Sequence, residues 1–288
     1  MTIRSILVPI DGAPGSEVAL DAALELGRRF ESCVELLHVE TDPVTALAGL
    51  SEGISGAAVG LAVEGGRAAA EARRKQVRRL AAARCGAKGL ELAEAGSGPA
   101  VGYAAAWRHV VGRANEEVAR RGRLFDLIVL DRPDAEAAGI ASGVFEVALF
   151  DTRRPVLVVP PAPAEAPGRK VAVAWNGSAE AAAAVGGALP FLMQAEEVTV
   201  VAIGDDEDAA GPEGLVRYLA CHGVRAAVRH VAPGSAAAGV QILEAAEALG
   251  ADLLIMGAYG HSRLRELVLG GATRDILGSA TLPVLMAH

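Results

Sequence analysis

The chain has 288 residues, a length typical of two domains that each bury a core of their own. Its residues are 52% hydrophobic and 22% charged, a composition typical of a globular protein and not of a disordered one. The formal net charge of −8 disfavours nonspecific attraction to nucleic acid or to an anionic membrane. These bulk properties predict a globular protein that binds neither.

Cysteine spacing and hydropathy restrict the class of protein further. Cys33, Cys85 and Cys221 are widely separated and form no CxxC pair, so neither a disulfide framework nor a zinc site is indicated. The chain enters a strand pattern at its first residues without the features of a signal peptide. No apolar run reaches the roughly 18 to 20 residues of a bilayer-spanning helix. We expect a cytoplasmic protein.

The first predicted elements recur in the second part of the chain. Residues 3–12, IRSILVPIDG, match residues 169–177, RKVAVAWNG, and each segment is an apolar strand that ends in Asp or Asn followed by glycine. An amphipathic helix is predicted after each strand, over residues 16–30 and 178–193, because apolar residues recur at helical spacing. This self-similarity predicts two copies of one unit.

The next elements differ in length between the copies. Second strands are predicted over residues 33–39 and 197–203. The first copy then carries a long insertion, residues 41–93, with an arginine-rich helix over Gly66–Arg84, where the second copy has only the shorter segment 211–222. The sequence favours a solvated face for this helix, although a site for an acidic ligand stays as an alternative. Its basic residues are Arg73, Arg74, Arg78 and Arg79.

The match returns at the end of each copy. Residues 125–130 match 251–256, and residues 154–159 match 282–287, where a proline opens the last strand. Alternating strands and helices predict an α/β fold with two tandem Rossmann-like domains. Each is an open, five-stranded, mostly parallel sheet with helices on both faces. We place the first domain at residues 1–160, a proline-rich linker at 161–168 and the second domain at 169–288.

A glycine-rich stretch follows the strand at residues 251–256. Gly257 and Gly260 come directly after this strand, and Gly270 and Gly271 open the next predicted helix. Glycines let a backbone approach a phosphate closely, and a helix N-terminus attracts anions. Ligands of open α/β sheets bind at this end of the strands, so we predict a phosphate cradle. The other residues assigned to it are Met256, His261, Ser262, Arg263, Ala272 and Thr273.

The first copy provides an internal control for these glycines. Its matched residues are Asp131 for Gly257 and Asp134 for Gly260, with Ser142-Gly143 in place of Gly270-Gly271. The alternative, that the glycines only form two tight turns, is weakened because the same predicted fold does without them. Carboxylates at these positions would repel phosphates, so we expect the first copy to exclude ATP unless a cation intervenes.

Four segments together resemble the universal stress protein family in its tandem two-domain form. They are ILVPIDG at the first strand, LLHV at the second, DLLIMGAYGHS at residues 252–262, and the ending GGATRDILGSATLPVLMAH. The resemblance implies a fold like that of the adenine nucleotide alpha hydrolases. Members that bind ATP carry Gly-x-x-Gly, nine residues, then Gly-Ser or Gly-Thr. Gly257, Gly260 and Gly270 keep that spacing, but Gly271 stands where the hydroxyl is usual.

The resemblance also implies where an adenine base would lie. In the family it contacts the ends of the first two strands and an Asp after the first, which places it here beside Ala174, Trp175, Asn176 and Ile203. Asn176 replaces the Asp, and a carboxamide can both donate and accept hydrogen bonds. The first copy keeps Pro9, Asp11 and Val39 for this base side.

The resemblance implies a stress-response protein that binds ATP, or AMP, ADP or cyclic AMP, with Mg²⁺ as a candidate companion. The two copies are expected to form an intramolecular pseudo-dimer through the strand at residues 283–287, and whole chains to form a homodimer. Two alternatives stay open: a slow ATPase or nucleotide-transfer enzyme, and a nucleotide-free scaffold or binder of an apolar ligand. Asp11, Asp126 and Asp252 form no evident acid–base pair, and the six histidines show no metal-binding spacing.

Overall fold

The computed structural model describes residues 2–44, 56–96, 101–132, 140–161, 167–204, 211–258 and 271–288. We call residues 1–160 the first half and residues 169–288 the second half. The elements of the first half are β1 (Ser5–Pro9), α1 (Pro14–Phe30), β2 (Cys33–Glu40), α3 (Gly56–Ala87), β3 (Leu92–Glu94), β4 (Ala104–Val111), α4 (Ala114–Gly122), β5 (Leu127–Asp131), α5 (Ile140–Asp151) and β6 (Val156–Val159).

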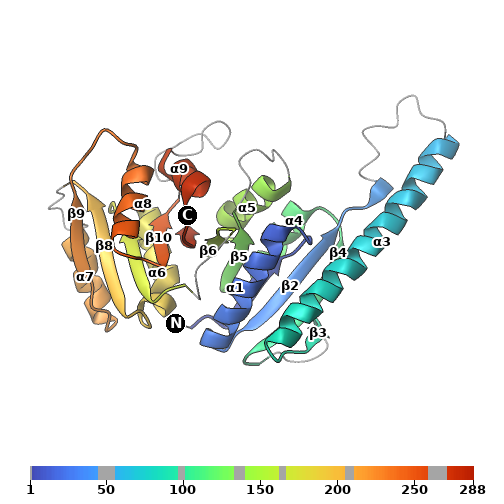
Figure 1. Ribbon diagram of the computed structural model, residues 1–288, viewed down its shortest axis with the longest axis horizontal. Helices are drawn as coiled ribbons and strands as arrows, with labels where there is room; N and C mark the ends of the chain where they lie inside the picture. Colours follow the sequence, from blue (N-terminus) through green and yellow to red (C-terminus); the bar gives the residue numbers. More distant parts are fainter. Residues whose placement is uncertain are drawn as a thin grey trace.

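The second half repeats the alternation of strands and helices. Its elements are β7 (Lys170–Ala174), α6 (Ala179–Leu192), β8 (Glu197–Ile203), α7 (Pro212–Cys221), β9 (Ala227–Val231), α8 (Ala238–Ala248), β10 (Leu253–Gly257), α9 (Gly271–Ser279) and β11 (Val284–Ala287). Figure 1 shows the second half on the left, the first half on the right, and α3 along the outer side of the first half.

All the described strands belong to one sheet of eleven, in the order β3-β4-β2-β1-β5-β6-β11-β10-β7-β8-β9. Every neighbouring pair is parallel except β6 and β11, which pair antiparallel with Leu157 opposite Leu285. The predicted α/β class with a mostly parallel sheet is confirmed. The second half has the five expected strands, and the first half gains a sixth because the short β3 extends its edge.

Helices cover both faces of this sheet, as predicted. On one face α1, α3, α6 and α7 contribute buried residues to a core that includes Ile6, Val173 and Phe191. On the other face α4, α5, α8 and α9 pack over the alternate strand residues, such as Leu7 and Ala172. Because side chains of a strand alternate between faces, the apolar runs of the central strands serve both cores.

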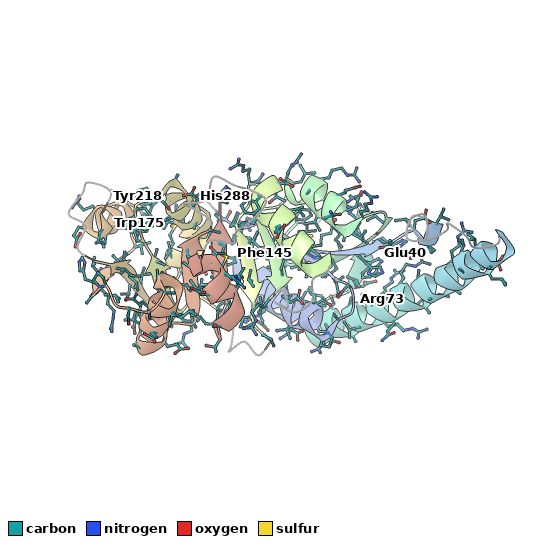
Figure 2. All side chains as sticks on the ribbon, turned by 90° about the horizontal axis from the view of Figure 1, so that it is seen from above. Glu40, Arg73, Phe145, Trp175, Tyr218 and His288 are labelled. Carbon is teal, nitrogen blue, oxygen red and sulfur yellow. The ribbon has the colours of Figure 1, made fainter. Side chains whose placement is uncertain are left out.

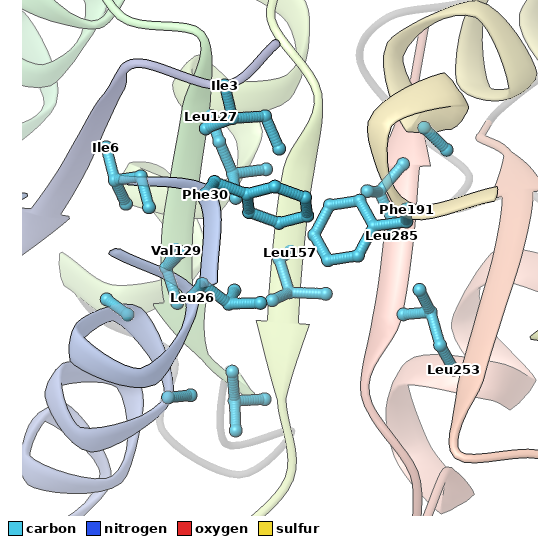
Figure 3. Close-up of a cluster of buried hydrophobic side chains, with 14 of the residues drawn as sticks. Ile3, Ile6, Leu26, Phe30, Leu127, Val129, Leu157, Phe191, Leu253 and Leu285 are labelled. Atoms are coloured by element: carbon cyan, nitrogen blue, oxygen red, sulfur yellow. The ribbon is translucent and has the colours of Figure 1, made fainter. Parts of the chain in front are cut away.

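The two cores are continuous across the β6–β11 seam. On the α1 side, Phe30 packs edge-on against Phe191 of α6 with ring centroids 5.0 Å apart, between Leu157 and Leu285 (Figure 3). Arg29 lies over both rings and donates hydrogen bonds to the Pro167 and Gly168 carbonyls, at 2.8 and 3.2 Å. Burying a Phe side chain contributes about 1.5–3 kcal/mol, so this aromatic pair is a substantial part of the contact between the halves.

A matched aspartate secures the amino-terminal start of each half's first strand. Asp126 accepts hydrogen bonds from the backbone N–H groups of Arg4 and Ser5 at 2.9 and 3.0 Å. Asp252 does the same for Gly168 and the residues after it, at 2.8 to 3.1 Å. Both carboxylates are therefore structural and lie at the end of the sheet opposite the predicted ligand site.

Cross-element ion pairs tie α3 to the first half. Arg74 pairs with Glu40 at the end of β2, at 3.1 Å, and Arg78 pairs with Glu94 of β3. Arg84 reaches two acidic residues of α1, at 2.7 and 2.8 Å. Two of the arginines predicted to lie on a solvated face, Arg74 and Arg78, therefore form ion pairs that join α3 to β2 and β3. In the described part of the chain, no helix is both long enough and apolar enough to cross a bilayer.

Candidate nucleotide site

In each half the order of strands reverses beside the first strand. β7 pairs with β8 on one side and with β10 on the other. After β7 the chain first adds β8 and β9 on one side, and then returns to add β10 and β11 on the opposite side. Met256 and Ala174 are register partners at the carboxyl ends of their strands. Such a reversal point is where open α/β sheets bind ligands. The structure therefore brings the predicted residues of β7 and β10 together.

A tight turn after β7 holds the residues predicted to face a base. Trp175 is half-buried against the core, and its backbone N–H donates to the Val201 carbonyl at 2.9 Å. The side-chain oxygen of Asn176 accepts from the backbone N–H of Ser178 at 3.2 Å, and Gly177 has φ of +71°. This hydrogen bond uses one lone pair of the Asn176 oxygen, and the carboxamide keeps a second lone pair and the two N–H donors of its NH₂ group.

The first half builds the same turn but pairs its acid. Asp11 accepts from the backbone N–H of Ala13 at 2.9 Å, and Gly12 has φ of +85°. The other side-chain oxygen of Asp11 lies 3.8 Å from Arg73 of α3, which also donates to the Asp11 carbonyl at 2.9 Å. A Cβ on Gly12 would collide with Val77 of α3. Helix α3 thus packs directly on the base side of the first half.

Gly257 ends β10 directly against the first turn of α6. A Cβ at this position would collide with the backbone N of Ala181 and would lie 2.6 Å from the carbonyl carbon of Glu180. The contact is with backbone, which cannot swing away as a flexible side chain can. Gly257 therefore has a packing role that only glycine satisfies, in addition to the close approach to a ligand that it allows.

The matched contact in the first half is filled by a carboxylate. Asp131 ends β5, and its side chain lies where a Cβ on Gly15, in the first turn of α1, would be. The glycine therefore changes sides between the halves. The first half has Asp131 on the strand and Gly15 in the helix, whereas the second half has Gly257 on the strand and Glu180 in the helix. Burial raises the pKa of Asp131 above its ordinary value, and the negative charge of Asp11 raises it further. The predicted carboxylate at the strand end of the first half is in place.

Helix α9 begins with the last three predicted residues of the cradle. Gly271 is exposed, and a Cβ there would meet no atom within 4 Å. Thr273 is only 3% exposed, and Ala272 packs so closely on α8 that a Cβ on Gly239 would lie 2.7 Å from its carbonyl oxygen. Ile203, at the end of β8, is partly buried. Because Thr273 is buried, its position does not favour its hydroxyl as a substitute for the one missing at position 271.

Several predicted positions lie outside the described residues. They are Gly260, His261, Ser262, Arg263 and Gly270 of the second half and Asp134 of the first. The assignment of these residues to a phosphate cradle stays a prediction. Among the described residues, no group of three or more His, Cys, Asp or Glu side chains is arranged to hold a metal ion.

The structure also groups residues that the sequence argument did not combine. His38 is buried, bonds the Ile10 carbonyl through Nδ1 at 2.9 Å, and stacks on His109 at a centroid distance of 6.0 Å. His109 lies 3.1 Å from Glu40, at the end of the same two strands. Burial lowers the pKa of His38. His38 is thus a packed side chain, and its pairing with His109 of β4 depends on a strand register that neither sequence segment reveals.

Comparisons with known proteins agree with this arrangement. The model of the universal stress protein family matches residues 2–132 and 219–288, which is more than half of the chain. A universal stress protein of Archaeoglobus fulgidus has the same fold, with a TM-score of 0.71 and 16% identity, over 98% of this chain and 97% of that one. A second structure, a functionally unknown protein of Pseudomonas aeruginosa, gives a TM-score of 0.58 and 17% identity over 99% and 92%.

Curated relatives match over shorter segments. A universal stress protein of Synechocystis is 56% identical over 34 residues, 12% of each chain. One of Methanocaldococcus jannaschii is 37% identical over 46 residues, 16% of this chain and 28% of the relative. The aligned segments thus span less than a third of either relative. With the family model matching both halves, the chain belongs to the universal stress protein family.

Proposed function

We propose that the second half binds ATP, or a related adenine nucleotide, at the carboxyl ends of β7, β8 and β10. In this proposal the base lies beside Trp175, Asn176 and Ile203, and the phosphates lie between Gly257 and the start of α9. The protein then acts in the stress response by binding and signalling, with residues 1–160, 161–168 and 169–288 as first domain, linker and second domain. The two domains act as an intramolecular pseudo-dimer around the β6–β11 seam.

The observation that carries this proposal is the reciprocal exchange at the two strand ends. The second half has Gly257, with no side chain, where the first half holds the half-buried carboxylate of Asp131 against a helix N-terminus. A helix N-terminus favours anions, and a carboxylate already placed there competes with a phosphate for the same position. The first half is accordingly the one expected to exclude a nucleotide.

Gly271 offers a direct test, because a side chain fits there. Gly271→Asp places a carboxylate at the start of α9 without a steric collision, and acidic residues near a helix N-terminus are stabilising. Gly143→Asp is the matched control, since Gly143 of α5 is the sequence match of Gly271 and a Cβ there also meets no atom within 4 Å. The measurement is isothermal titration of ATP, with and without Mg²⁺, after removal and identification of any nucleotide that co-purifies.

We expect ATP binding by the wild type and by Gly143→Asp, and at least a tenfold weaker affinity for Gly271→Asp, about 1.4 kcal/mol. Unfolding curves of all three proteins control for stability. Equal ATP affinity in the two variants would contradict the assignment of the phosphates to this helix, and absence of binding by the wild type would contradict the function itself.

A further inference from the structure

The start of the proposed phosphate site is held by the last residues of the chain. Ala258, which follows Gly257, is fully buried, and its backbone N–H donates to the Ala287 carbonyl at 2.9 Å. The Ala258 carbonyl lies 2.9 Å from Nδ1 of His288. A carbonyl can only accept, so His288 donates through Nδ1–H. Both backbone groups of Ala258 are therefore fixed from the β11 side.

His288 is itself supported by the first half. Its ring packs edge-on against Phe150 of α5, with centroids 4.8 Å apart and planes at 79°. Figure 2 shows His288 between Trp175 of the second half and Phe145 of α5 along the long axis of the molecule. The aromatic contact restricts the ring, so an element of the first half orients the donor that holds the end of β10.

The helix on the other side of the proposed site is held directly by the first half. Arg132, which follows Asp131, donates from Nη1 to the Ala280 carbonyl at 3.0 Å. Ala280 comes directly after the last residue of α9, so the guanidinium lies at the negative end of the helix dipole, where a cation is stabilising. Arg132 and Pro160 also line a small pocket with Ile276 and Leu277 of α9.

These contacts have no chemical equivalent at the first half's site. Arg132 is matched by Ala258, whose side chain is a methyl group, and His288 is matched by Pro160, which has neither a side-chain donor nor a backbone N–H. The first half therefore supports the elements that frame the second site, while the matched residues cannot return that support. This asymmetry, like the presence of Gly257 in place of Asp131, favours a ligand in the second half over one in the first.

We propose that His288 and Arg132 are positioning residues for the nucleotide site of the second half. His288 fixes the end of β10 and Arg132 fixes α9, so the first domain sets the separation of the two elements between which the phosphates lie. This inference rests on the proposed function. It assigns to the first half a role in binding that does not require a nucleotide of its own.

Two substitutions at position 288 separate the hydrogen bond from the packing. His288→Phe keeps an aromatic ring for Phe150 and removes the donor, whereas His288→Asn places an NH₂ group close to the position of Nδ1 and removes the ring. If positioning of Ala258 matters, His288→Phe raises the Kd for ATP about fivefold, the equivalent of one lost hydrogen bond. His288→Asn should recover only part of that affinity, because it restores the donor but loses the ring contact with Phe150.

Arg132 has a matched control in the same half. Arg123 donates from Nε to the carbonyl of Asp151, the last residue of α5, at 3.0 Å. Arg123→Gln and Arg132→Gln therefore remove the same kind of contact at the end of two different helices. We expect Arg132→Gln to raise the Kd for ATP about fivefold and Arg132→Lys to recover part of it, while Arg123→Gln leaves the Kd unchanged.

The experiment is titration of ATP into each full-length variant, with unfolding midpoints measured in parallel. ATP binding by the wild type together with unchanged Kd values for His288→Phe and Arg132→Gln would overturn the positioning roles and leave the proposed function intact. A wild type that does not bind ATP would overturn the proposed function instead. Equal loss of affinity in Arg123→Gln would show a general effect of helix stability and would also overturn the inference.

Discussion

The two halves share one fold, but they differ at the single edge of the sheet where a ligand would lie. The first half closes that edge: Asp131 fills the strand end, Arg73 pairs with Asp11, and Val77 of α3 packs on Gly12. The second half has Gly257 at the strand end and the ten-residue α7 where the first has the 32-residue α3. Each half thus needs a glycine on one side of this contact, Gly15 in the helix of the first half and Gly257 on the strand of the second, and the halves differ in whether a carboxylate ends the strand.

The largest expected effect concerns Gly257 itself. Gly257→Ala places a methyl group against the backbone of Ala181, and such overpacking lowers the free energy of unfolding by roughly 1–3 kcal/mol. We expect ATP binding to be lost as well. Gly271→Ala is the control, because its methyl group meets open space. Urea unfolding curves that give both variants the same stability would contradict the close contact between β10 and α6.

A smaller effect should follow from restoring the hydroxyl usual in the family. Gly271→Ser has room at the start of α9, and one additional hydrogen bond to a phosphate would tighten ATP binding about fivefold. The same change at Gly143 should leave the first half without measurable ATP binding, because Asp131 remains in place. Titration of ATP into the two variants measures both effects. A second bound ATP in Gly143→Ser would contradict the difference between the halves.

The smallest expected effect is a pH dependence in the first half. The pKa of Asp131 is raised by burial and by Asp11, so the folded state favours the protonated acid. The stabilisation that this gives is complete below the ordinary value of 3.8 and is lost as the pH rises through the raised pKa. Asp131→Asn should therefore gain stability relative to the wild type as the pH increases over that range.

Urea unfolding between pH 4 and pH 8 measures this difference. In an Asp11→Asn background the gain should be smaller and should end at a lower pH, because one of the charges that raises the Asp131 pKa has been removed. A stability difference between Asp131→Asn and the wild type that stays constant with pH would show that the carboxyl is not shielded from water as the structure indicates.

The strands and helices near the first strand of each half could be predicted from the sequence. Residues 16–30 and 178–193 were predicted as helices, and α1 and α6 occupy Pro14–Phe30 and Ala179–Leu192. The repeat gave each segment a matched partner, and strong apolar periodicity defined the ends. Helix α3 instead begins at Gly56 and not near Gly66, because alanine supports the helix where glycines interrupt the apolar period.

Strands toward the sheet edges were harder to locate. Neither β4 nor β9 could be located from the sequence. Every residue of β9, Ala227–Val231, is exposed or only partly buried, so this strand lacks the alternation that marks a half-buried strand. The exchange of Asp131 for Gly257 could be predicted, since it depends only on matching the two copies. The contacts of Arg73 with Asp11 and of His288 with Ala258 could not, because each joins residues that are distant in the sequence.

The antiparallel seam between β6 and β11 has a consequence for how such a protein can change. When two identical chains associate, each substitution appears in both copies, so an acid that closes one pocket closes both. Here the paired strands, Val156–Val159 and Val284–Ala287, belong to one polypeptide. A mutation alters one side alone, and a side relieved of ligand binding is free to specialise as a support for the other.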